Sequence, residues 1–215
     1  LKEVGGGRII ATVLPFVLQR LRMWDYLAAQ RVDYFVANSR FVAARIKRYY
    51  NRDATVIYPP VDVRNYPNLP KLNYFILVSR LRPYKKVDIA IRAFNRLNMQ
   101  LVICGDGEER SRLERIAGPN IHFTGLVSER AKKRLLAGAV GFIHPQEEDL
   151  GISAIEAMAG GAPVVAYARG GALETVRENE TGVFFEEQTW QSLADAVIRM
   201  RRQSFDYERI RAHSR

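Results

Sequence analysis

Short apolar runs alternate with longer amphipathic stretches from residue 73 onward, and this alternation limits the fold more than any other feature of the sequence. The runs have the length of buried strands, and the stretches between them have the helical period. The strands are predicted at residues 74–79, 100–104, 121–124, 140–144, 163–167 and 182–185, and the helices at residues 86–97, 108–117, 128–137, 151–159, 172–177 and 190–202. Strict alternation predicts right-handed βαβ units, and hence an α/β fold with a doubly wound parallel sheet.

A shorter set of elements precedes this region. Two strands, at residues 33–38 and 55–58, are predicted on either side of a helix at residues 40–50. The sequence that follows, residues 58–70, contains four prolines, which disfavour both helix and central strand. This segment is therefore predicted to be a linker.

The linker sets the expected domain boundaries. We expect three parts: the end of a preceding domain at residues 1–58, an interdomain linker at 59–72 and a complete α/β domain at 73–215. The first part is too short to be a domain by itself, and the chain begins with Leu1 rather than Met. We therefore expect the chain to be part of a longer protein.

The composition excludes several classes of protein. With 47% hydrophobic and 26% charged residues, the 215-residue chain has a globular composition. A single cysteine, Cys104, can form neither an internal disulfide nor a zinc site, and favours a reducing, cytoplasmic compartment. No apolar run reaches the roughly 20 residues that span a bilayer. The net charge of +10 is compatible with nucleic acid, a membrane surface or polyanionic small substrates, although the basic clusters have the spacing of solvated helix faces.

The loops after the predicted strands are where a ligand is expected, because open parallel sheets bind ligands at the carboxyl ends of their strands. The loop after the first of these strands carries Arg80, Lys85 and Lys86 just before a helix. Cations converging there could hold a diphosphate and stabilise the charge that develops on it as a leaving group. An ordinary solvated loop is the alternative.

Two glycine-rich loops are less specific. Gly105 and Gly107 suggest the dinucleotide-binding fingerprint, but Arg110 occupies the third glycine position. A nicotinamide-dependent or flavin-dependent oxidoreductase is therefore disfavoured, and a tight turn explains both glycines. Gly170 and Gly171 precede another predicted helix, where they either crowd close to a ligand or simply form a turn.

The segment after the strand at residues 140–144 is the most informative. Gly151, Ile152 and Ser153 are predicted to open a helix, where backbone amides and the helix dipole favour an anion. Two carboxylates flank this point: Glu148 just before the helix and Glu156 about two turns inside it. We expect them to serve different places and not to form a general acid/base pair. A helix cap and a surface charge are the alternatives.

Together these residues resemble the GT-B glycosyltransferases, in particular the large retaining group called family 4. Glu148 and Glu156 match the family's E-x7-E spacing within the string EDLGISAIEAMAGGAPVVA. Arg80 and Lys85, then CGDG from Cys104 and GLV ending at Val127, follow in the family's order and spacing. The resemblance covers about residues 33–200. It implies a GT-B fold in which a Rossmann-like C-terminal domain, residues 73–215, binds a nucleotide sugar, with a remnant of the N-terminal domain before it.

The resemblance implies which residues hold the diphosphate. Arg80 and Lys85 would bind it, doing what Mg²⁺ does in other enzymes, so neither a metal nor another cofactor is expected. The amides of Gly151, Ile152 and Ser153 would add further hydrogen bonds to the same group.

The remaining roles concern the sugar and the base. By resemblance, Glu148 would hold hydroxyls of the transferred sugar, Glu156 the ribose hydroxyls, and the backbone around Val127 the base. Lys86 stands where many relatives have Gly, and of the two adjacent lysines we take Lys85 as the phosphate ligand. His144 lies in the donor domain, and we expect it to be a packed or loop histidine and not the catalytic histidine that the family's first domain often supplies.

The resemblance also implies a reaction: transfer of a sugar from a nucleotide-sugar donor with retention, through an oxocarbenium-like transition state. The N-terminal stretch, with Trp24-Asp25, ANSR at residues 37–40 and VIYPPVD at residues 56–62, resembles mannosyltransferases of O-antigen and exopolysaccharide assembly, which use GDP-mannose. The acceptor would be a glycan or a lipid-linked glycan. Because acceptor contacts come from the domain largely missing here, we expect donor binding but weak or no transfer by this chain alone.

Two alternatives differ from this expectation. One is a UDP-sugar-dependent enzyme of the same family, since no residue independently distinguishes guanine from uracil. The other is a non-catalytic basic module for membrane or nucleic acid. Nucleic acid is disfavoured because no recognition motif or interleaved aromatic and basic platform is present. Peripheral contact with the inner face of a membrane, through basic helices such as residues 41–50, is compatible with a cytoplasmic enzyme.

Overall fold

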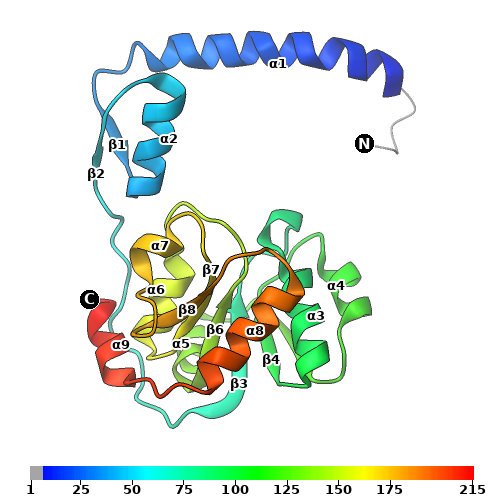
Figure 1. Cartoon of the computed structure of the whole chain (residues 1–215), viewed down its shortest axis with the longest axis vertical. Helices are drawn as coiled ribbons and strands as arrows, with labels where there is room; N and C mark the ends of the chain where they lie inside the picture. Colours follow the sequence, from blue (N-terminus) through cyan, green and yellow to red (C-terminus); the bar gives the residue numbers. More distant parts are fainter. Residues whose placement is uncertain (1–6) are drawn as a thin grey trace. The chain divides into compact units, whose positions relative to one another are not determined.

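The computed structural model describes residues 7–215, with side chains from residue 13 onward, and divides the chain into two units, Leu1–Tyr58 and Pro59–Arg215. The second unit is built on a parallel sheet of six strands in the order β5-β4-β3-β6-β7-β8 (Figure 1). The strands are β3 (Leu72–Val78), β4 (Leu101–Cys104), β5 (Ile121–Gly125), β6 (Ala139–His144), β7 (Val164–Tyr167) and β8 (Gly182–Phe185). The predicted α/β class with a doubly wound parallel sheet is confirmed.

Helices cover both faces of this sheet. One layer contains α3 (Val87–Leu97), α4 (Arg110–Ile116) and α8 (Trp190–Arg201), and the other contains α5 (Glu129–Gly138), α6 (Ile152–Ala159), α7 (Ala172–Thr175) and α9 (Tyr207–His213). In β3, Phe75 and Leu77 pack into the first layer and Ile76 into the second, and all three are buried. A strand covered on both faces needs apolar residues at successive positions, which explains its continuous apolar run. Helix α9 was not predicted.

The strand order reverses between β3 and β6. From β3 the chain winds outward through β4 to β5, and after returning to β6 it winds the other way through β7 to β8. The connections that leave β3 and β6 therefore diverge at the carboxyl ends of these neighbouring strands, where doubly wound sheets have a ligand crevice. The fold places Arg80 and Glu148 on the two loops that border this point.

The loop after β3 lies against the loop after β4, and two glycines permit the contact. Gly105 has a φ of +131°, and a Cβ added to it would lie 1.9 Å from the carbonyl oxygen of Ser79. A Cβ on Gly107 would lie 2.4 Å from the carbonyl oxygen of Leu81. Backbone amides of Ser79 and Leu81 donate across the same contact, to Cys104 (3.0 Å) and Asp106 (3.0 Å) respectively. The turn itself runs from Gly107 to Arg110, whose amide donates to the Gly107 carbonyl oxygen (3.1 Å). Both glycines support the loop that carries Arg80.

The first unit contains α1 (Gly7–Ala29), a parallel pair of strands, β1 (Phe35–Ala37) and β2 (Ala54–Val56), and α2 (Arg40–Tyr50) between them. Helix α2 has the predicted bounds: Ser39 caps its start by accepting from the amide of Val42 (3.1 Å), and Asn51 ends it in the left-handed conformation. Helix α1, which includes Pro15, was not predicted. In the part of the chain that the structure describes, no helix combines the length and apolarity needed to cross a membrane.

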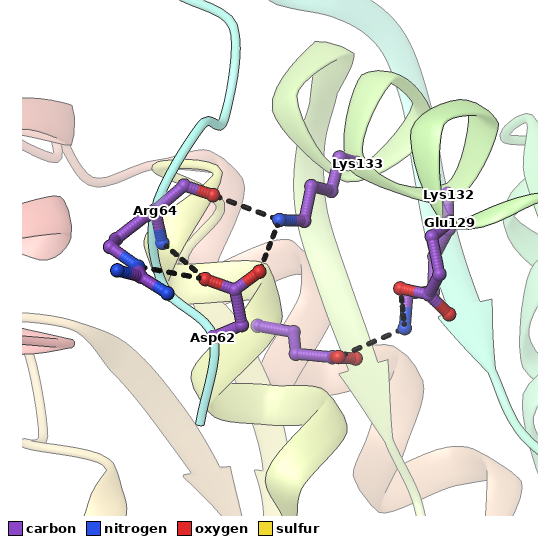
Figure 2. A network of polar contacts seen from close by, with 6 residues as sticks. Asp62, Arg64, Glu129, Lys132 and Lys133 are labelled. Carbon is purple, nitrogen blue, oxygen red and sulfur yellow. Dashed lines mark hydrogen bonds and ion pairs between the residues drawn. The ribbon is translucent and has the colours of Figure 1, made fainter. Parts of the chain in front are cut away.

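The segment before β3 contains neither helix nor strand between residues 57 and 71, as its prolines predicted. Part of it packs on the second unit. Lys133 of α5 donates to Asp62 Oδ2 (2.8 Å) and to the carbonyl oxygen of Arg64 (2.9 Å), as Figure 2 shows. Lys71 then donates to the carbonyl oxygens of Ala137 (2.9 Å) and Gly160 (3.0 Å), at the ends of α5 and α6. The role of residues 59–72 as an interdomain linker stays a prediction.

Replacing Gly105 with Ala is expected to destabilise the second unit by at least about 2 kcal/mol, because the new Cβ must displace the Ser79 carbonyl and the backbone is in a region that L residues avoid. Urea unfolding measures the change. Ser111→Ala, at an exposed site in α4, is the control and should stay within about 0.5 kcal/mol of the wild type. Equal stabilities of the two variants would contradict the close contact.

The Asp62–Lys133 contact predicts a pH dependence. Hydrogen bonds from Lys133 and from the Arg64 amide lower the pKa of Asp62 from 3.8 to about 2. A carboxylate with a lowered pKa stabilises the fold above its unfolded pKa and loses this effect as the pH falls through the folded value. Asp62→Asn should therefore be less stable than the wild type at neutral pH, with a difference that disappears between pH 3.8 and about 2. Urea unfolding across this range tests it, with exposed Asp195→Asn as the control; a pH-independent difference would contradict the assignment.

Candidate functional site

The cations predicted after β3 lie on a short, turned segment. Arg80 lies two residues after the end of β3 and is exposed. Lys85 ends the 3-10 turn η1 (Pro83–Lys85) and is half-buried. Lys86 comes next with a φ of 54°, a left-handed conformation that favours glycine, and joins η1 to α3. This left-handed backbone explains why many relatives have Gly at the position of Lys86.

Lys85 and Glu148 form an ion pair across the point where the strand order reverses. Lys85 Nζ donates to Glu148 Oε1, and only 16% and 19% of the two side chains are exposed. Lys85 comes from the loop after β3, and Glu148 from the loop after β6. The fold thus joins a predicted phosphate ligand to a predicted sugar ligand, a pairing that sequence spacing did not reveal.

Gln146 and His144 surround the same carboxylate. Gln146 Nε2 donates to Glu148 Oε1 (2.9 Å) and lies 3.3 Å from His144 Nδ1. Burial raises the pKa of Glu148, but the interactions with His144, Lys85 and Gln146 lower it by more, so the pKa lies below its usual range. Burial lowers the pKa of His144 to about 4. The expectation of a packed histidine is confirmed: His144 is buried at the end of β6.

Gly170 and Gly171 support the backbone of Glu148. The amide of Gly171 donates to the carbonyl oxygen of Glu148 (2.8 Å). A Cβ on Gly170, which has a φ of +65°, would lie 2.4 Å from that oxygen, and one on Gly171 would lie 2.4 Å from the carbonyl oxygen of Asp149. The structure shows one of the two sequence interpretations, a turn, packed against the Glu148 loop. Close approach to a ligand stays a prediction.

Helix α6 begins beside this ion pair. Gly151 precedes it with a φ of 84°, and no side chain caps the helix. The amides of the first turn, which includes Ile152 and Ser153, have no acceptor within the helix. The His144 ring lies against Gly151, since a Cβ there would be 3.2 Å from His144 Nε2. Three features that favour an anion therefore occur at one edge of the sheet: Arg80, Lys85 and an uncapped helix start.

Glu156 has its own lysine. Lys132 Nζ of α5 donates to Glu156 Oε1 (2.9 Å) and lies 3.0 Å from Glu129 Oε2. The Lys132 and Glu156 side chains are only 15% and 18% exposed. Figure 2 shows Lys132 and Lys133 reaching from α5 to different partners. The two carboxylates of the E-x7-E spacing thus bind different lysines, Lys85 for Glu148 and Lys132 for Glu156.

A cavity of about 290 Å³ lies beside the loop after β3. Its lining includes Ser79, Arg80, Val127, Glu129 and Lys132. The structure therefore brings Arg80 together with Val127. It adds three charged residues that the sequence analysis missed: Asp106 and, from the start of α5, Glu129 and Lys132. In the sequence, Glu129 and Lys132 are marked only by their spacing: an acid and a lysine three positions apart at the start of the helix after Val127.

Comparison with known proteins gives the family. The model of the family "Glycosyl transferases group 1" matches residues 62–215. The chain belongs to this family. A GDP-mannose-dependent alpha-mannosyltransferase of Mycolicibacterium smegmatis is 33% identical over 122 residues, which cover 56% of this chain and 32% of that protein. A GDP-mannose-dependent monoacylated alpha-(1-6)-phosphatidylinositol monomannoside mannosyltransferase of Corynebacterium glutamicum is 29% identical, covering 93% of this chain and 62% of that protein.

Solved structures confirm that the chain has a fold of the GT-B type. The Anabaena protein Alr3699/HepE, crystallised in complex with UDP and glucose, superposes with a TM-score of 0.72 at 22% identity, covering 85% of this chain and 56% of that one. The chain spans less than two thirds of the length of the relatives it matches. Among its described residues, no group of three or more His, Cys, Asp and Glu side chains is placed to hold a metal ion.

Replacing Lys85 with Met is expected to cost about 1–3 kcal/mol of stability, because it leaves the Glu148 charge largely buried and unpaired. Adding Glu148→Gln should restore part of this loss, so the double variant should be more stable than the sum of the single effects predicts. Urea unfolding of all four proteins measures the coupling. Lys86→Met is the control, and it shows whether removing any lysine of this loop lowers the stability by the same amount. If the stability losses of Lys85→Met and Glu148→Gln were strictly additive, the ion pair would be contradicted.

Proposed function

We propose that this chain is the donor-binding part of a retaining glycosyltransferase that transfers mannose from GDP-mannose to a glycan or lipid-linked acceptor in cell-surface polysaccharide synthesis. The observation that carries the proposal is the Lys85–Glu148 ion pair next to the uncapped start of α6, where the strand order reverses. Arg80 lies on the same loop as Lys85. Membership of the glycosyl transferases group 1 family supports it. The curated relatives named as GDP-mannose-dependent support the donor.

The diphosphate would lie between the loop after β3 and the start of α6. Arg80 supplies a guanidinium that can bind two phosphate oxygens, and Lys85 supplies a point charge. The amides of Gly151, Ile152 and Ser153 complete the set. These donors stabilise the charge that grows on the leaving diphosphate as the glycosidic bond breaks, and in our proposal they do so without a metal ion.

The two carboxylates would hold hydroxyl groups on either side of the diphosphate. Glu148 would accept from hydroxyls of the transferred sugar, and Glu156 from those of the ribose. Both are ion-paired to lysines through Oε1 in this structure, so a ligand hydroxyl can bind to Oε2 without replacing the lysine. A lowered pKa keeps Glu148 in the ionised, accepting form.

The cavity beside Val127 favours guanine over uracil. Guanine presents two adjacent donor sites, N1–H and N2–H₂, next to the acceptor O6, whereas uracil has one N–H between two carbonyl oxygens. Glu129 can accept from the two donor sites, and Lys132 can donate to O6. Burial lowers the pKa of Lys132, but its hydrogen bonds to Glu156 and Glu129 raise it by more, so the side chain stays a cation. This charge pattern supports a guanine nucleotide as the donor's carrier, and the UDP complex of Alr3699/HepE favours a UDP-sugar as the second candidate.

The acceptor is proposed from the relatives. The Corynebacterium glutamicum protein is named for a phosphatidylinositol monomannoside, a lipid. A lipid-linked acceptor is consistent with a cytoplasmic enzyme that contacts the membrane peripherally. We expect the acceptor contacts to come from outside residues 59–215, so transfer by this donor-binding unit alone should be weak.

The experiment that tests the donor is calorimetric titration of the chain with GDP-mannose, GDP, UDP-glucose and UDP in the presence of a chelator. We expect GDP compounds to bind more tightly than UDP compounds. Glu156→Gln should weaken all of them about tenfold, because a neutral amide is a poorer ribose acceptor. Glu129→Gln should reduce the preference for GDP over UDP by a similar factor, and Glu108→Gln, an exposed acid outside the cavity, is the control.

The outcomes separate the candidates. If UDP compounds bound more tightly, the proposed glycosyltransferase function would stand, and the proposed donor would change from GDP-mannose to a UDP-sugar. Binding that requires Mg²⁺ would contradict the metal-independent site, and no binding of any nucleotide sugar would contradict the donor-binding function of this chain.

A further inference from the structure

Two polar side chains are buried completely beside Glu148. His144 and Gln146 are 1% and 2% exposed, at the end of β6. Gln146 Nε2 bonds to Glu148 Oε1 (2.9 Å) and to His144 Nδ1 (3.3 Å). The Phe142 ring stacks on the imidazole at 6.3 Å between centroids. A chain of polar contacts therefore runs from His144 through Gln146 to Glu148, and ends at Lys85.

The hydrogen-bonding groups fix the direction of this chain. Ionised Glu148 can only accept, so Gln146 must turn its amide nitrogen, and not its oxygen, toward Glu148. The second N–H of the same amide then points to His144 Nδ1, which accepts in the neutral tautomer that carries its proton on Nε2. Only one orientation of the amide satisfies both neighbours. The Glu148 carboxylate is thereby held by a planar group that is itself locked in place.

This arrangement reduces stability, because His144 Nε2 and Gln146 Oε1 are both buried without a hydrogen-bond partner among the described residues. Apolar side chains of the same size would fill the space without that loss. His144 and Gln146 therefore lower the stability of the fold, and they lie next to Glu148, a candidate ligand group. A role in holding the Glu148 carboxylate in place explains why such a pair is found there.

We propose that His144 and Gln146 are positioning residues that fix the Glu148 carboxylate for the hydroxyls of the transferred sugar. The inference rests on the proposed function of Glu148. Within the described part of the chain, the side-chain hydrogen bonds of Glu148 to Lys85 and Gln146 both use Oε1, so Oε2 is left for the sugar. Gln146 keeps the carboxylate in place when Lys85 turns to the diphosphate, and His144 keeps Gln146 in the orientation that donates.

The first test measures the affinity of the full chain for GDP-mannose and for GDP by calorimetry. Gln146→Met removes both donors at similar size, and His144→Leu removes the acceptor. Each should weaken GDP-mannose about tenfold and leave GDP nearly unchanged, since only the sugar contacts Glu148. His144→Asn should restore the wild-type ratio, because its Oδ1 can take the place of Nδ1. Gln188→Met is the matched control, since that amide bonds to the Pro145 carbonyl oxygen and not to Glu148.

A merely structural role would give a different result: melting temperature and both affinities would fall together, and His144→Asn would behave like His144→Leu. That result would overturn the proposal.

The second test does not depend on the ligand. Carbon-13 NMR follows the titration of the Glu148 carboxyl, and Gln146→Met should raise its pKa because a hydrogen bond to the ionised form is lost. An unchanged titration would overturn the positioning role. If the wild type binds no nucleotide sugar, the proposed function fails, and the NMR titration still decides whether Gln146 positions Glu148.

Discussion

The ion pair between Lys85 and Glu148 is the interaction on which the candidate site depends, because it joins the two halves of the sheet where their connections diverge. Two charges that are more than four-fifths covered lose much of their hydration, and the loss is offset only if each keeps good partners. Gln146 gives the carboxylate a second donor. The pair is therefore poor evidence of stability for its own sake, and better evidence that both charges are retained for a ligand.

Backbone contacts, more than side chains, bring these charges together. The loop that leads from β3 to Lys85 is held against the loop after β4 through Gly105, and the Glu148 loop is held against the loop after β7 through Gly170 and Gly171. In each case a carbonyl oxygen occupies the place of a Cβ. The carbonyl contacts leave little freedom to the two loops, so Lys85 and Glu148 are preorganised before any ligand arrives.

The sequence predicted the inner strands of the sheet well because they are buried on both faces and form nearly unbroken apolar runs. Edge strand β5 was predicted although His122 and Thr124 are exposed. It also predicted that charged loops gather at one edge, which follows from parallel strands alone. It did not predict partners separated by 63 residues, as in Lys85–Glu148, or by 24, as in Lys132–Glu156, because these depend on strand order and helix packing and not on local pattern. Helix α1 was missed because its apolar side chains do not keep to one stripe and it contains Pro15; Phe16 and Trp24 are 74% and 69% exposed.

Both acids of the E-x7-E spacing meet a cation in this structure, and this determines how a nucleotide sugar would enter under the proposed function. A diphosphate attracts Lys85 more strongly than a single carboxylate does, because it carries more charge. As Lys85 turns to the phosphates, Glu148 loses its counter-charge and becomes a stronger acceptor for sugar hydroxyls. The diphosphate and the sugar would then be bound cooperatively through one lysine.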